Sequence, residues 1–341
     1  MKFPAAPFDA IKAMAGGGVT CVTGGAGFIG GHVVNTLIAA GASVRVIDDL
    51  SNSSLDAIAD DIELHTDRLR FVYGSILDER ALDESIAGAE TVIHLAAMGS
   101  VPRSLEEPER AAAVNTTGTL RVLEAARRHG VRRVVFAGSS SAYGNPERLP
   151  CDEMFATQPL SPYAASKLAA EEFCRAWSAS YGLSTVCLRY FNVFGPRQRA
   201  DSAYAAVVAA FAGRLLAGKH PMIFGDGEQS RDFTFVANAV YATCLAAFSD
   251  TKLDGQAINV GTGSSCTVNE LAARMAARLA PGAPPAEHRD PRTGDVRDSL
   301  ASIERAASLL GYQPIVGLDE GLDQTCDWFV QTHAPAEERR P

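Results

Sequence analysis

Short runs of β-branched residues alternate with longer stretches rich in alanine and leucine from Val19 onward. A short apolar run bounded by turn residues is typical of a buried strand, whereas a longer alanine- and leucine-rich stretch is typical of a helix. Strands are predicted at residues 19–23, 43–47, 69–72, 91–94, 133–137 and 185–188. Strands and helices in alternation build a parallel sheet that helices cover on both faces. The pattern therefore predicts an α/β fold with a doubly wound parallel sheet.

The alternation weakens after about Tyr190, where loops rich in glycine and proline become frequent. Helices are predicted at residues 29–40, 119–129, 203–217, 268–279 and 303–310. We expect residues 19–190 to form mainly the doubly wound domain. Residues 191–332 are expected to form mainly a smaller α/β part built over the sheet rather than a further βαβ array, with interleaving between the two. Residues 1–18 are expected to be a leader, and residues 333–341 a tail.

The composition is that of a folded protein with an acidic surface. Of the 341 residues, 47% are hydrophobic and 21% are charged, and the formal net charge is -9. This apolar content argues against disorder, and the acidic balance argues against binding to nucleic acid or to an anionic membrane. The chain shows neither a signal-peptide pattern nor an apolar run long enough to span a bilayer. We therefore expect a cytoplasmic protein that has no membrane partner.

The cysteines lack the spacing of a metal site. Seven of them are scattered without a Cys-x-x-Cys motif or a cluster with histidine: Cys21, Cys151, Cys174, Cys187, Cys244, Cys266 and Cys326. A chain of this length does not need disulfides to fold. We expect reduced thiols and no bound metal.

A glycine-rich segment, Thr23-Gly24-Gly25-Ala26-Gly27-Phe28-Ile29-Gly30, follows the first predicted strand and opens the first long helix. This is the context of the Rossmann dinucleotide fingerprint, in which glycines admit a pyrophosphate to a helix N-terminus. The second strand leads into Asp48 and Asp49, at the distance where a carboxylate meets the adenosine ribose. An acid there disfavours a 2′-phosphate, so NAD is predicted rather than NADP. The alternatives are a tight turn that binds no ligand, and an Asp48 that only caps a helix or lies on the surface.

Tyr163 and Lys167 lie one turn apart on a helix that Ser161-Pro162 is predicted to start. Tyrosine is a poor base at its ordinary pKa of about 10, and a nearby ammonium together with an oxidised nicotinamide would lower that pKa. Upstream, the strand at 133–137 runs into Ser139-Ser140-Ser141, and ligands bind at such carboxyl ends of parallel strands. Taken singly, a Tyr/Lys pair is usually surface decoration and a serine run is usually a loop. Their order behind a glycine loop favours a catalytic site.

Together with these motifs, four further segments make the chain resemble an extended short-chain dehydrogenase/reductase, and within that group the UDP-sugar 4-epimerases. The additional segments are His94-Leu95-Ala96-Ala97, Asn115-Thr116-Thr117-Gly118, the RYFNVFGPRQ sequence of 189–198 and the SRDFTFV sequence of 230–236. The resemblance covers nearly the whole chain, from about Val19 to Trp328. It implies a tightly held NAD, a UDP-sugar substrate and a homodimer with the Tyr163 helix near the interface.

The same resemblance assigns roles to the site residues. Tyr163 would take the proton of the sugar 4-hydroxyl, Ser139 would relay that proton, and Lys167 would tune Tyr163 and bind the nicotinamide ribose. The first domain would bind NAD, and the C-terminal part the UDP moiety. The implied cofactor contacts are Gly24, Gly27, Phe28, Ile29, Gly30, Asp48, Asp49, Asn52, Ser53, Ser75, Ile76, Leu95, Ala96, Ala97, Asn115, Tyr163 and Lys167. The implied substrate contacts are Ser100, Arg103, Ser139, Ser140, Ser141, Tyr163, Asn192, Arg231, Arg292 and Ser299.

Four positions distinguish this chain within the family. Dehydratase relatives carry an Asp-Glu pair where this chain has Ser140 and Ser141, so dehydration is not expected. Many relatives have an aspartate where this chain has Ser75, which changes an adenine contact. Relatives restricted to UDP-glucose and UDP-galactose carry a bulky tyrosine at the position of Ser299, whereas relatives that admit 2-acetamido sugars carry a small residue there.

The loop with Ser100 and Arg103 also resembles the subgroup that acts on UDP-N-acetylglucosamine. The resemblance therefore implies interconversion of UDP-GlcNAc and UDP-GalNAc through a 4-keto sugar, with UDP-Glc and UDP-Gal as a slower pair. Two alternatives stay open. One is a UDP-glucuronate 4-epimerase or decarboxylase of the same fold, and the other is a non-catalytic NAD-binding sensor or scaffold.

Overall fold

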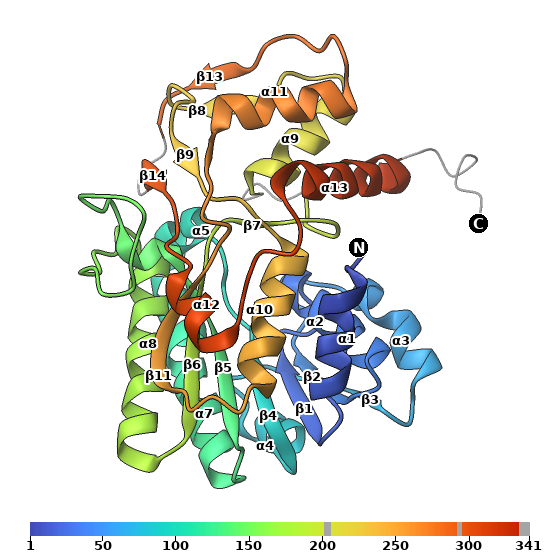
Figure 1. Ribbon diagram of the computed structural model, residues 1–341, viewed down its shortest axis with the longest axis vertical. Helices are drawn as coiled ribbons and strands as arrows, with labels where there is room; N and C mark the ends of the chain where they lie inside the picture. Colours follow the sequence, from blue (N-terminus) through green and yellow to red (C-terminus); the bar gives the residue numbers. More distant parts are fainter. Residues whose placement is uncertain (201–205, 292–294, 334–341) are drawn as a thin grey trace.

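The computed structural model describes residues 1–200, 206–291 and 295–333, and these form a seven-stranded parallel sheet at the centre of the molecule (Figure 1). The strand order is β3-β2-β1-β4-β5-β6-β11. The strands are β1 (Val19–Thr23), β2 (Ser43–Asp48), β3 (Leu69–Tyr73), β4 (Ala89–His94), β5 (Arg133–Ser139), β6 (Ser184–Tyr190) and β11 (Asp254–Val260). All six predicted strands are present within a residue or two of their expected bounds, and the predicted doubly wound fold is confirmed.

Helices cover both faces of this sheet. One face carries α2 (Phe28–Ala39) and α10 (Val236–Phe248), and the other carries α4 (Glu79–Ile86), α7 (Gly118–Arg128) and α8 (Pro162–Tyr181). Successive residues of β1 serve different faces, since Val22 packs with the α2 and α10 side while Cys21 packs with the α4, α7 and α8 side. Strands buried on both faces explain the continuous apolar runs of the sequence.

The seventh strand was not expected. Residues 254–260 follow α10 and pair with β6 in parallel, so they add a further strand–helix unit to the sheet from the C-terminal half of the chain. One such unit is not a further βαβ array, but it shows that the C-terminal half contributes to the central sheet. The sequence Asp-Gly-Gln-Ala-Ile-Asn-Val has only a short apolar stretch, because its first three residues are not hydrophobic and Asn259 interrupts the rest.

Residues 5–14, expected to lie in a leader, instead form helix α1 (Ala5–Met14), which packs on α10. Ile11 on this helix is fully buried, and the Phe3 ring contacts the Tyr241 ring at 6.4 Å. Ala5, Phe8, Ile11 and Met14 recur every three residues and give the helix an apolar face. The three glycines that follow, Gly16–Gly18, obscure this short pattern.

The C-terminal part lies beyond the carboxyl ends of the strands (Figure 1). Its helices there are α9 (Val207–Leu216), α11 (Val268–Leu279) and α13 (Leu318–His333), whereas α12 (Glu304–Leu310) packs beside β11 and α10. Its short strands are β7 (Val193–Phe194) with β10 (Thr234–Phe235), β8 (Met222–Phe224) with β13 (Glu287–Arg289), and β9 (Ser230–Arg231) with β12 (Cys266–Thr267) and β14 (Asp298–Ser299). The helices predicted at 268–279 and 303–310 are confirmed. Of the helix predicted at 203–217, the structure describes residues 206–217, and α9 begins there at Val207.

The remaining short elements are η1 (Leu55–Ala57), α3 (Ala59–Leu64), α5 (Val101–Glu106), α6 (Pro108–Ala112), the π-helical turn η2 (Ala113–Thr117) and η3 (Ser140–Tyr143). A π-turn is rare, and such turns often occur at functional sites. Here it falls on the Asn115-Thr116-Thr117 motif, directly before α7.

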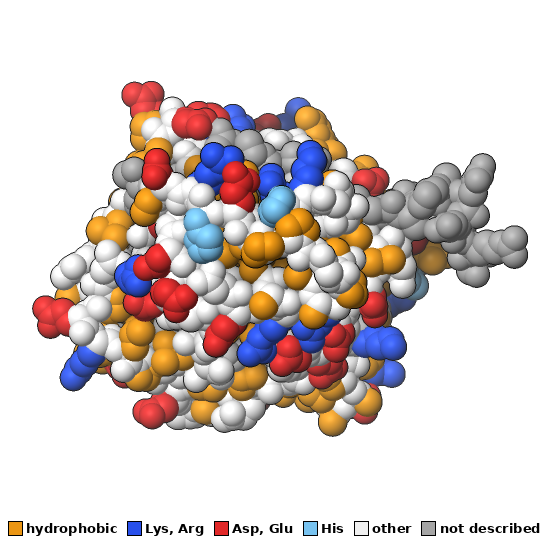
Figure 2. Space-filling view, turned by 90° about the horizontal axis from the view of Figure 1, so that it is seen from above, with side chains coloured by type: hydrophobic (Ala, Val, Ile, Leu, Met, Phe, Trp, Pro, Cys, Tyr) orange, Lys and Arg blue, Asp and Glu red, His pale blue; other side chains and the backbone are white. Residues whose placement is uncertain are grey.

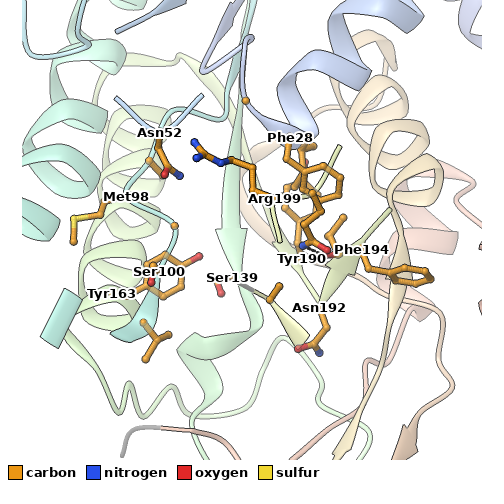
Figure 3. A pocket seen from close by; sticks show the side chains of 18 of the residues that line it. Phe28, Asn52, Met98, Ser100, Ser139, Tyr163, Tyr190, Asn192, Phe194 and Arg199 are labelled. Atoms are coloured by element: carbon orange, nitrogen blue, oxygen red, sulfur yellow. Dashed lines mark hydrogen bonds between the residues drawn. The ribbon is translucent and has the colours of Figure 1, made fainter. Parts of the chain in front are cut away.

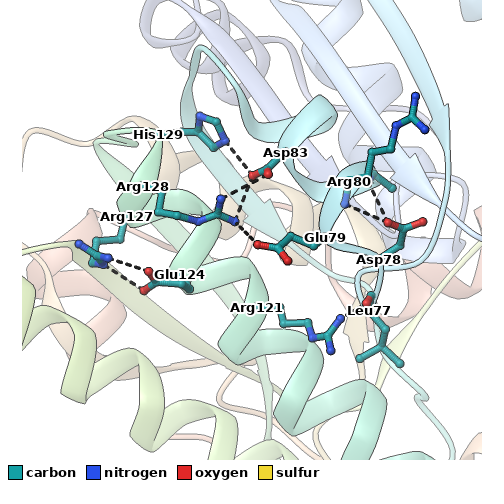
Figure 4. A network of polar contacts seen from close by, with 11 residues as sticks. Leu77, Asp78, Glu79, Arg80, Asp83, Arg121, Glu124, Arg127, Arg128 and His129 are labelled. Atoms are coloured by element: carbon teal, nitrogen blue, oxygen red, sulfur yellow. Dashed lines mark hydrogen bonds and ion pairs between the residues drawn. The ribbon is translucent and has the colours of Figure 1, made fainter.

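The surface carries mixed charges. Between α4 and α7, Asp83 accepts from His129 Nε2 (2.9 Å) and pairs with Arg128 (3.1 Å), as Figure 4 shows. Exposed pairs of this kind contribute little to stability. Figure 2, which looks down on the C-terminal part, likewise shows acidic and basic side chains interspersed.

Within the described residues, each helix is too short or too polar to cross a bilayer, and no group of three or more potential metal ligands occurs. All seven cysteines are buried free thiols.

Candidate active site

A pocket of about 1770 Å³ lies at the carboxyl ends of the strands, between the sheet and the C-terminal part. Loops after β1, β2, β4 and β5 line one side of it, and residues from β7, β9 and β14 line the other. Pockets for a single small molecule usually have about 300–1,000 Å³. This pocket therefore has room for a cofactor and a substrate together.

The glycine loop between β1 and α2 is closed too tightly for side chains. Gly24 has φ +70°, and a Cβ atom there would stand 2.6 Å from the Ala96 nitrogen. A Cβ atom on Gly30 would collide with the Gly24 carbonyl oxygen. The turn brings the start of α2 to the pocket, and Gly27 precedes this helix without a capping side chain. The first amide groups of α2 are thus suited to hold an anion such as a pyrophosphate.

Asp48 ends β2 and organises the neighbouring loops. Its Oδ2 accepts from the Ala26 nitrogen (3.0 Å), and its Oδ1 accepts from the Leu50 nitrogen and from Ser53 Oγ (both 2.9 Å). An ionised carboxylate has about four acceptor positions, so these three bonds leave capacity for a ribose hydroxyl. Asp49 is exposed, and its side chain accepts from the Ser51 nitrogen.

Helix α8 carries Tyr163 and Lys167 into the pocket. Ser161 Oγ accepts from the Ala164 nitrogen (3.2 Å) and caps the helix, and Pro162 occupies its first turn, as predicted. The buried Lys167 donates from Nζ to the Ala137 carbonyl oxygen (2.9 Å), and its ammonium lies 4.9 Å from the Phe136 ring centre. Burial lowers the pKa of Lys167 to about 8.

The hydroxyl of Tyr163 faces β5 (Figure 3). Burial raises the pKa of Tyr163 above its ordinary value, and a hydrogen bond with Ser139 opposes part of that rise. Without NAD, Lys167 does not lower the pKa of Tyr163, because its ammonium is directed to the Ala137 carbonyl oxygen. The expected lowering involves a bound nicotinamide as well. Ser139 also accepts from the Ser141 nitrogen (3.2 Å), and the two serine hydroxyls lie 2.8 Å apart.

Three residues of the opposite wall are linked to one another through their loops. Asn192 Nδ2 donates to Ser299 Oγ (3.1 Å) and to the Asp232 carbonyl oxygen (3.2 Å). The Arg231 guanidinium donates to the carbonyl oxygens of Ser230 (2.9 Å) and Arg297 (2.6 Å), and also to that of Val296. Burial lowers the pKa of Arg231. These bonds place an arginine and a small hydroxyl side by side on the wall opposite α8.

Comparisons with known proteins agree with this geometry. Residues 20–261 match the model of the NAD dependent epimerase/dehydratase family. The UDP-glucose 4-epimerase of Mycolicibacterium smegmatis is 41% identical over 314 residues, which are 91% of this chain and 98% of that protein. The chain belongs to the NAD-dependent epimerase/dehydratase family.

Solved structures of this epimerase/dehydratase family have the same fold. The UDP-N-acetylglucosamine 4-epimerase of Methanobrevibacter ruminantium, in complex with UDP-N-acetylmuramic acid, superimposes with a TM-score of 0.87 at 36% identity, covering 93% of this chain and 99% of that one. The UDP-glucose 4-epimerase of Thermus thermophilus, in complex with NAD, gives 0.82 at 35% identity, covering 93% and 100%. The predicted membership in the extended short-chain dehydrogenase/reductases and the predicted cofactor, NAD, are confirmed.

The residues present fit NAD. Side chains at Gly24 or Gly30 would prevent the tight turn that brings α2 to the pocket, and the uncapped start of α2 can receive the pyrophosphate. Asp48, at the end of β2, lies in the pocket wall where its negative charge disfavours a 2′-phosphate. When bound, NAD supplies a hydride acceptor that can also return the hydride.

The structure brings most of the predicted site residues together in one pocket. Those that line it on the cofactor side are Gly24, Gly27, Phe28, Ile29, Gly30, Asp48, Asp49, Asn52, Ser53, Ser75, Ile76, Leu95, Ala96, Ala97, Tyr163 and Lys167. Those predicted to bind substrate are Ser100, Arg103, Ser139, Ser140, Ser141, Asn192, Arg231 and Ser299. Arg292 lies outside the described residues.

Asn115 is the exception among the described predictions. It is buried away from the pocket, and its side chain accepts from the Met98 nitrogen (2.8 Å) and donates to Ser166 Oγ (2.9 Å). A contact between Asn115 and the cofactor is therefore not supported, because its amide is used to join the loop after β4 to α8.

Other pocket residues were not predicted. Arg197 and Arg199 follow β7 and line the pocket, and Figure 3 shows Arg199 directed into it. Arg197 adopts φ +69° and donates to the Ala57 carbonyl oxygen (3.1 Å), so it ties this loop to the cofactor side. Arg197 lies within the RYFNVFGPRQ segment, whose positive charge is the signal in the sequence that points to it.

Proposed function

We propose that this family member is a 4-epimerase of UDP-hexoses that interconverts UDP-GlcNAc and UDP-GalNAc, and UDP-Glc and UDP-Gal more slowly. The observation that carries the choice of sugar is the small, buried Ser299 beside Asn192 on the substrate wall. A small side chain at this position leaves volume for a 2-acetamido group. The relative from Methanobrevibacter ruminantium, which bears the name of a UDP-N-acetylglucosamine 4-epimerase, supports this choice.

The chemistry assigned to the chain is proton transfer at the sugar 4-hydroxyl. Tyr163 takes that proton while Ser139 hydrogen-bonds the same oxygen, since the two hydroxyls already approach each other. Lys167 contributes positive charge beneath the cofactor site and favours the ionised form of Tyr163 once the ligands are bound. The resulting 4-keto sugar rotates in the pocket and presents the opposite face of C4. Tyr163 returns the proton to the oxygen when the hydride is returned to that face.

The substrate wall is proposed to hold the UDP moiety. Arg231 presents a guanidinium that bonds only backbone carbonyls among the described residues, so it can also attract a diphosphate. Arg292 is proposed as a second phosphate contact. Ser100 and Arg103 lie at the start of α5, where Ser100 caps the helix and Arg103 pairs with Glu107 (2.8 Å). We place this loop against the sugar.

We also propose a homodimer through the outer surface of α7 and α8. Phe173, Trp177 and Tyr181 form a ladder of edge-on aromatic contacts along α8, with ring centres 6.1 and 5.2 Å apart. Tyr181 is 56% exposed. An aromatic stripe of this kind suits burial against a second copy of the chain. Light scattering tests this proposal, and the expected mass is that of two chains.

A panel of UDP-sugars, followed by NMR at the anomeric proton, tests the function. UDP-GlcNAc should give UDP-GalNAc at the highest rate, and UDP-Glc should give UDP-Gal more slowly. Conversion of UDP-glucuronate alone would replace this proposal with the acidic-sugar alternative. Absence of conversion of every sugar, with NAD bound, would favour a sensor or scaffold.

A further inference from the structure

A series of buried hydrogen bonds connects the wall of the cofactor pocket to the backbone of Tyr163, and it passes through His94. This histidine is the last residue of β4 and is only 1% exposed. It does not line the pocket. Its imidazole lies between Thr23, at the start of the glycine loop, and Thr119, in the first turn of α7.

Both ring nitrogens of His94 contact threonine hydroxyls. Nδ1 lies 2.7 Å from Thr23 Oγ1, and Nε2 lies 2.9 Å from Thr119 Oγ1. Thr119 donates its own hydroxyl proton to the Asn115 carbonyl oxygen (2.6 Å), so towards His94 it can only accept. The proton of the neutral ring is therefore on Nε2, and Nδ1 accepts from Thr23. Thr23 in turn accepts from the nitrogen of the pocket residue Ala96 (3.2 Å).

The series continues from the π-helical turn to α8. Asn115 Nδ2 donates to Ser166 Oγ (2.9 Å), and Ser166 donates to the Tyr163 carbonyl oxygen (2.8 Å). Each hydrogen bond in the series is donated in the same direction, beginning at the Ala96 amide and ending at the Tyr163 carbonyl oxygen. A satisfied buried network of this kind restricts its members to one arrangement.

The charge of His94 also matters for Lys167. Their side chains approach the same Phe136 ring, with the imidazole centre at 5.6 Å and the ammonium at 4.9 Å from its centre. Burial, and to a smaller extent Lys167, lowers the pKa of His94 to about 3. A neutral ring thus avoids repulsion of the ammonium on which the site depends.

We propose that His94, held as the neutral Nε2–H tautomer, is a positioning residue that fixes the backbone of Tyr163 relative to the wall of the NAD pocket. The inference rests on the proposed role of Tyr163 and extends it to a residue that touches neither ligand. Misplacement of a reacting group by about 1 Å can lower a rate about a hundredfold. The network therefore acts on turnover rather than on substrate affinity.

Variants separate positioning from simple stability. His94→Leu removes both hydrogen bonds, and kcat should fall about tenfold to a hundredfold while the KM for the UDP-sugar changes less than about threefold. His94→Gln keeps one acceptor and one donor, and should restore most of the lost kcat. Thr119→Val removes the Nε2 partner and should lower kcat. Its matched control is Thr185→Val, which removes a buried hydroxyl that donates to the Cys174 carbonyl oxygen (2.8 Å) away from the network, and should leave kcat unchanged.

The ¹⁵N NMR spectrum of the imidazoles provides a readout that needs no turnover. We expect His94, assigned by its loss in His94→Gln, to show the Nε2–H tautomer at neutral pH. An Nδ1–H tautomer or an imidazolium would overturn the proposal, as would wild-type kcat in a folded His94→Leu protein. If the wild-type protein converts no UDP-sugar, the proposed function fails, and the tautomer still decides whether the network exists.

Discussion

The side-chain amide of Asn192 donates to the hydroxyl of Ser299 at 3.1 Å. These residues are far apart in sequence, and their contact joins the loop after β6 to strand β14. This wall of the pocket thus carries a small side chain that a neighbour holds in place. The volume and the hydrogen bond at Ser299 can be tested separately.

Replacing Ser299 by tyrosine should fill the space proposed for the acetamido group. We expect Ser299→Tyr to lower kcat/KM for UDP-GlcNAc about a hundredfold or more, but for UDP-Glc less than about tenfold. Ser299→Ala is the matched control, because it removes the bond to Asn192 and keeps the space, so it should retain preference for the acetamido sugar. Equal losses for both sugars in Ser299→Tyr would contradict the pocket argument.

Removing the Tyr163 hydroxyl should stop proton transfer without emptying the cofactor site. Tyr163→Phe should lower kcat about a hundredfold to ten-thousandfold. The amount of NAD that copurifies, measured by its absorbance after denaturation, should stay at the wild-type value. Full turnover by Tyr163→Phe would exclude this residue as the acid–base group.

Lys167 should make stability depend on pH. Burial lowers its pKa from 10.5 to about 8, so the folded protein releases the proton earlier than the unfolded chain does as pH rises. The cost of burying the charge is therefore full below about pH 8 and disappears toward pH 10.5. Relative to Lys167→Met, the wild-type protein should gain up to about 3 kcal/mol in free energy of unfolding over this interval. Urea denaturation of both proteins, freed of NAD, at about pH 7 and about pH 10 measures the difference; a constant difference would refute the assignment.

The glycine loop should not tolerate a methyl group at Gly30. A Cβ atom there collides with the Gly24 carbonyl oxygen, which would open the turn that brings α2 to the pocket. We expect Gly30→Ala to weaken NAD binding at least about tenfold by calorimetry. Gly16→Ala serves as the control, because a Cβ atom at Gly16 meets no neighbour within 4 Å, and it should bind NAD like the wild type.

The fold could be predicted from the sequence wherever the local pattern was strong. The runs at 19–23 and 133–137 are apolar on both faces, so their strands were identified. The strand at 254–260 has no strong local pattern, because its pairing with β6 depends on tertiary packing and its apolar residues are few and interrupted by Asn259. Helix α1 was missed for a similar reason, since its stability comes largely from contact with α10 rather than from length.

The residues of the site could be predicted better than the hydrogen-bond partners of their side chains. The glycine loop, Ser139, Tyr163 and Lys167 meet in one pocket, as their motif context indicated. Sequence spacing carries no information on which polar partner a side chain selects. The motif context therefore predicts a cofactor contact for Asn115, although its amide joins Met98 to Ser166.

The most direct test of the account is conversion of UDP-GlcNAc in deuterated water, followed by proton NMR. Epimerisation by removal and return of the same hydride predicts an anomeric signal of UDP-GalNAc, with ordinary hydrogen retained at C4 of both sugars. An unchanged UDP-GlcNAc spectrum with NAD bound, or deuterium at C4 of the product, would contradict the account.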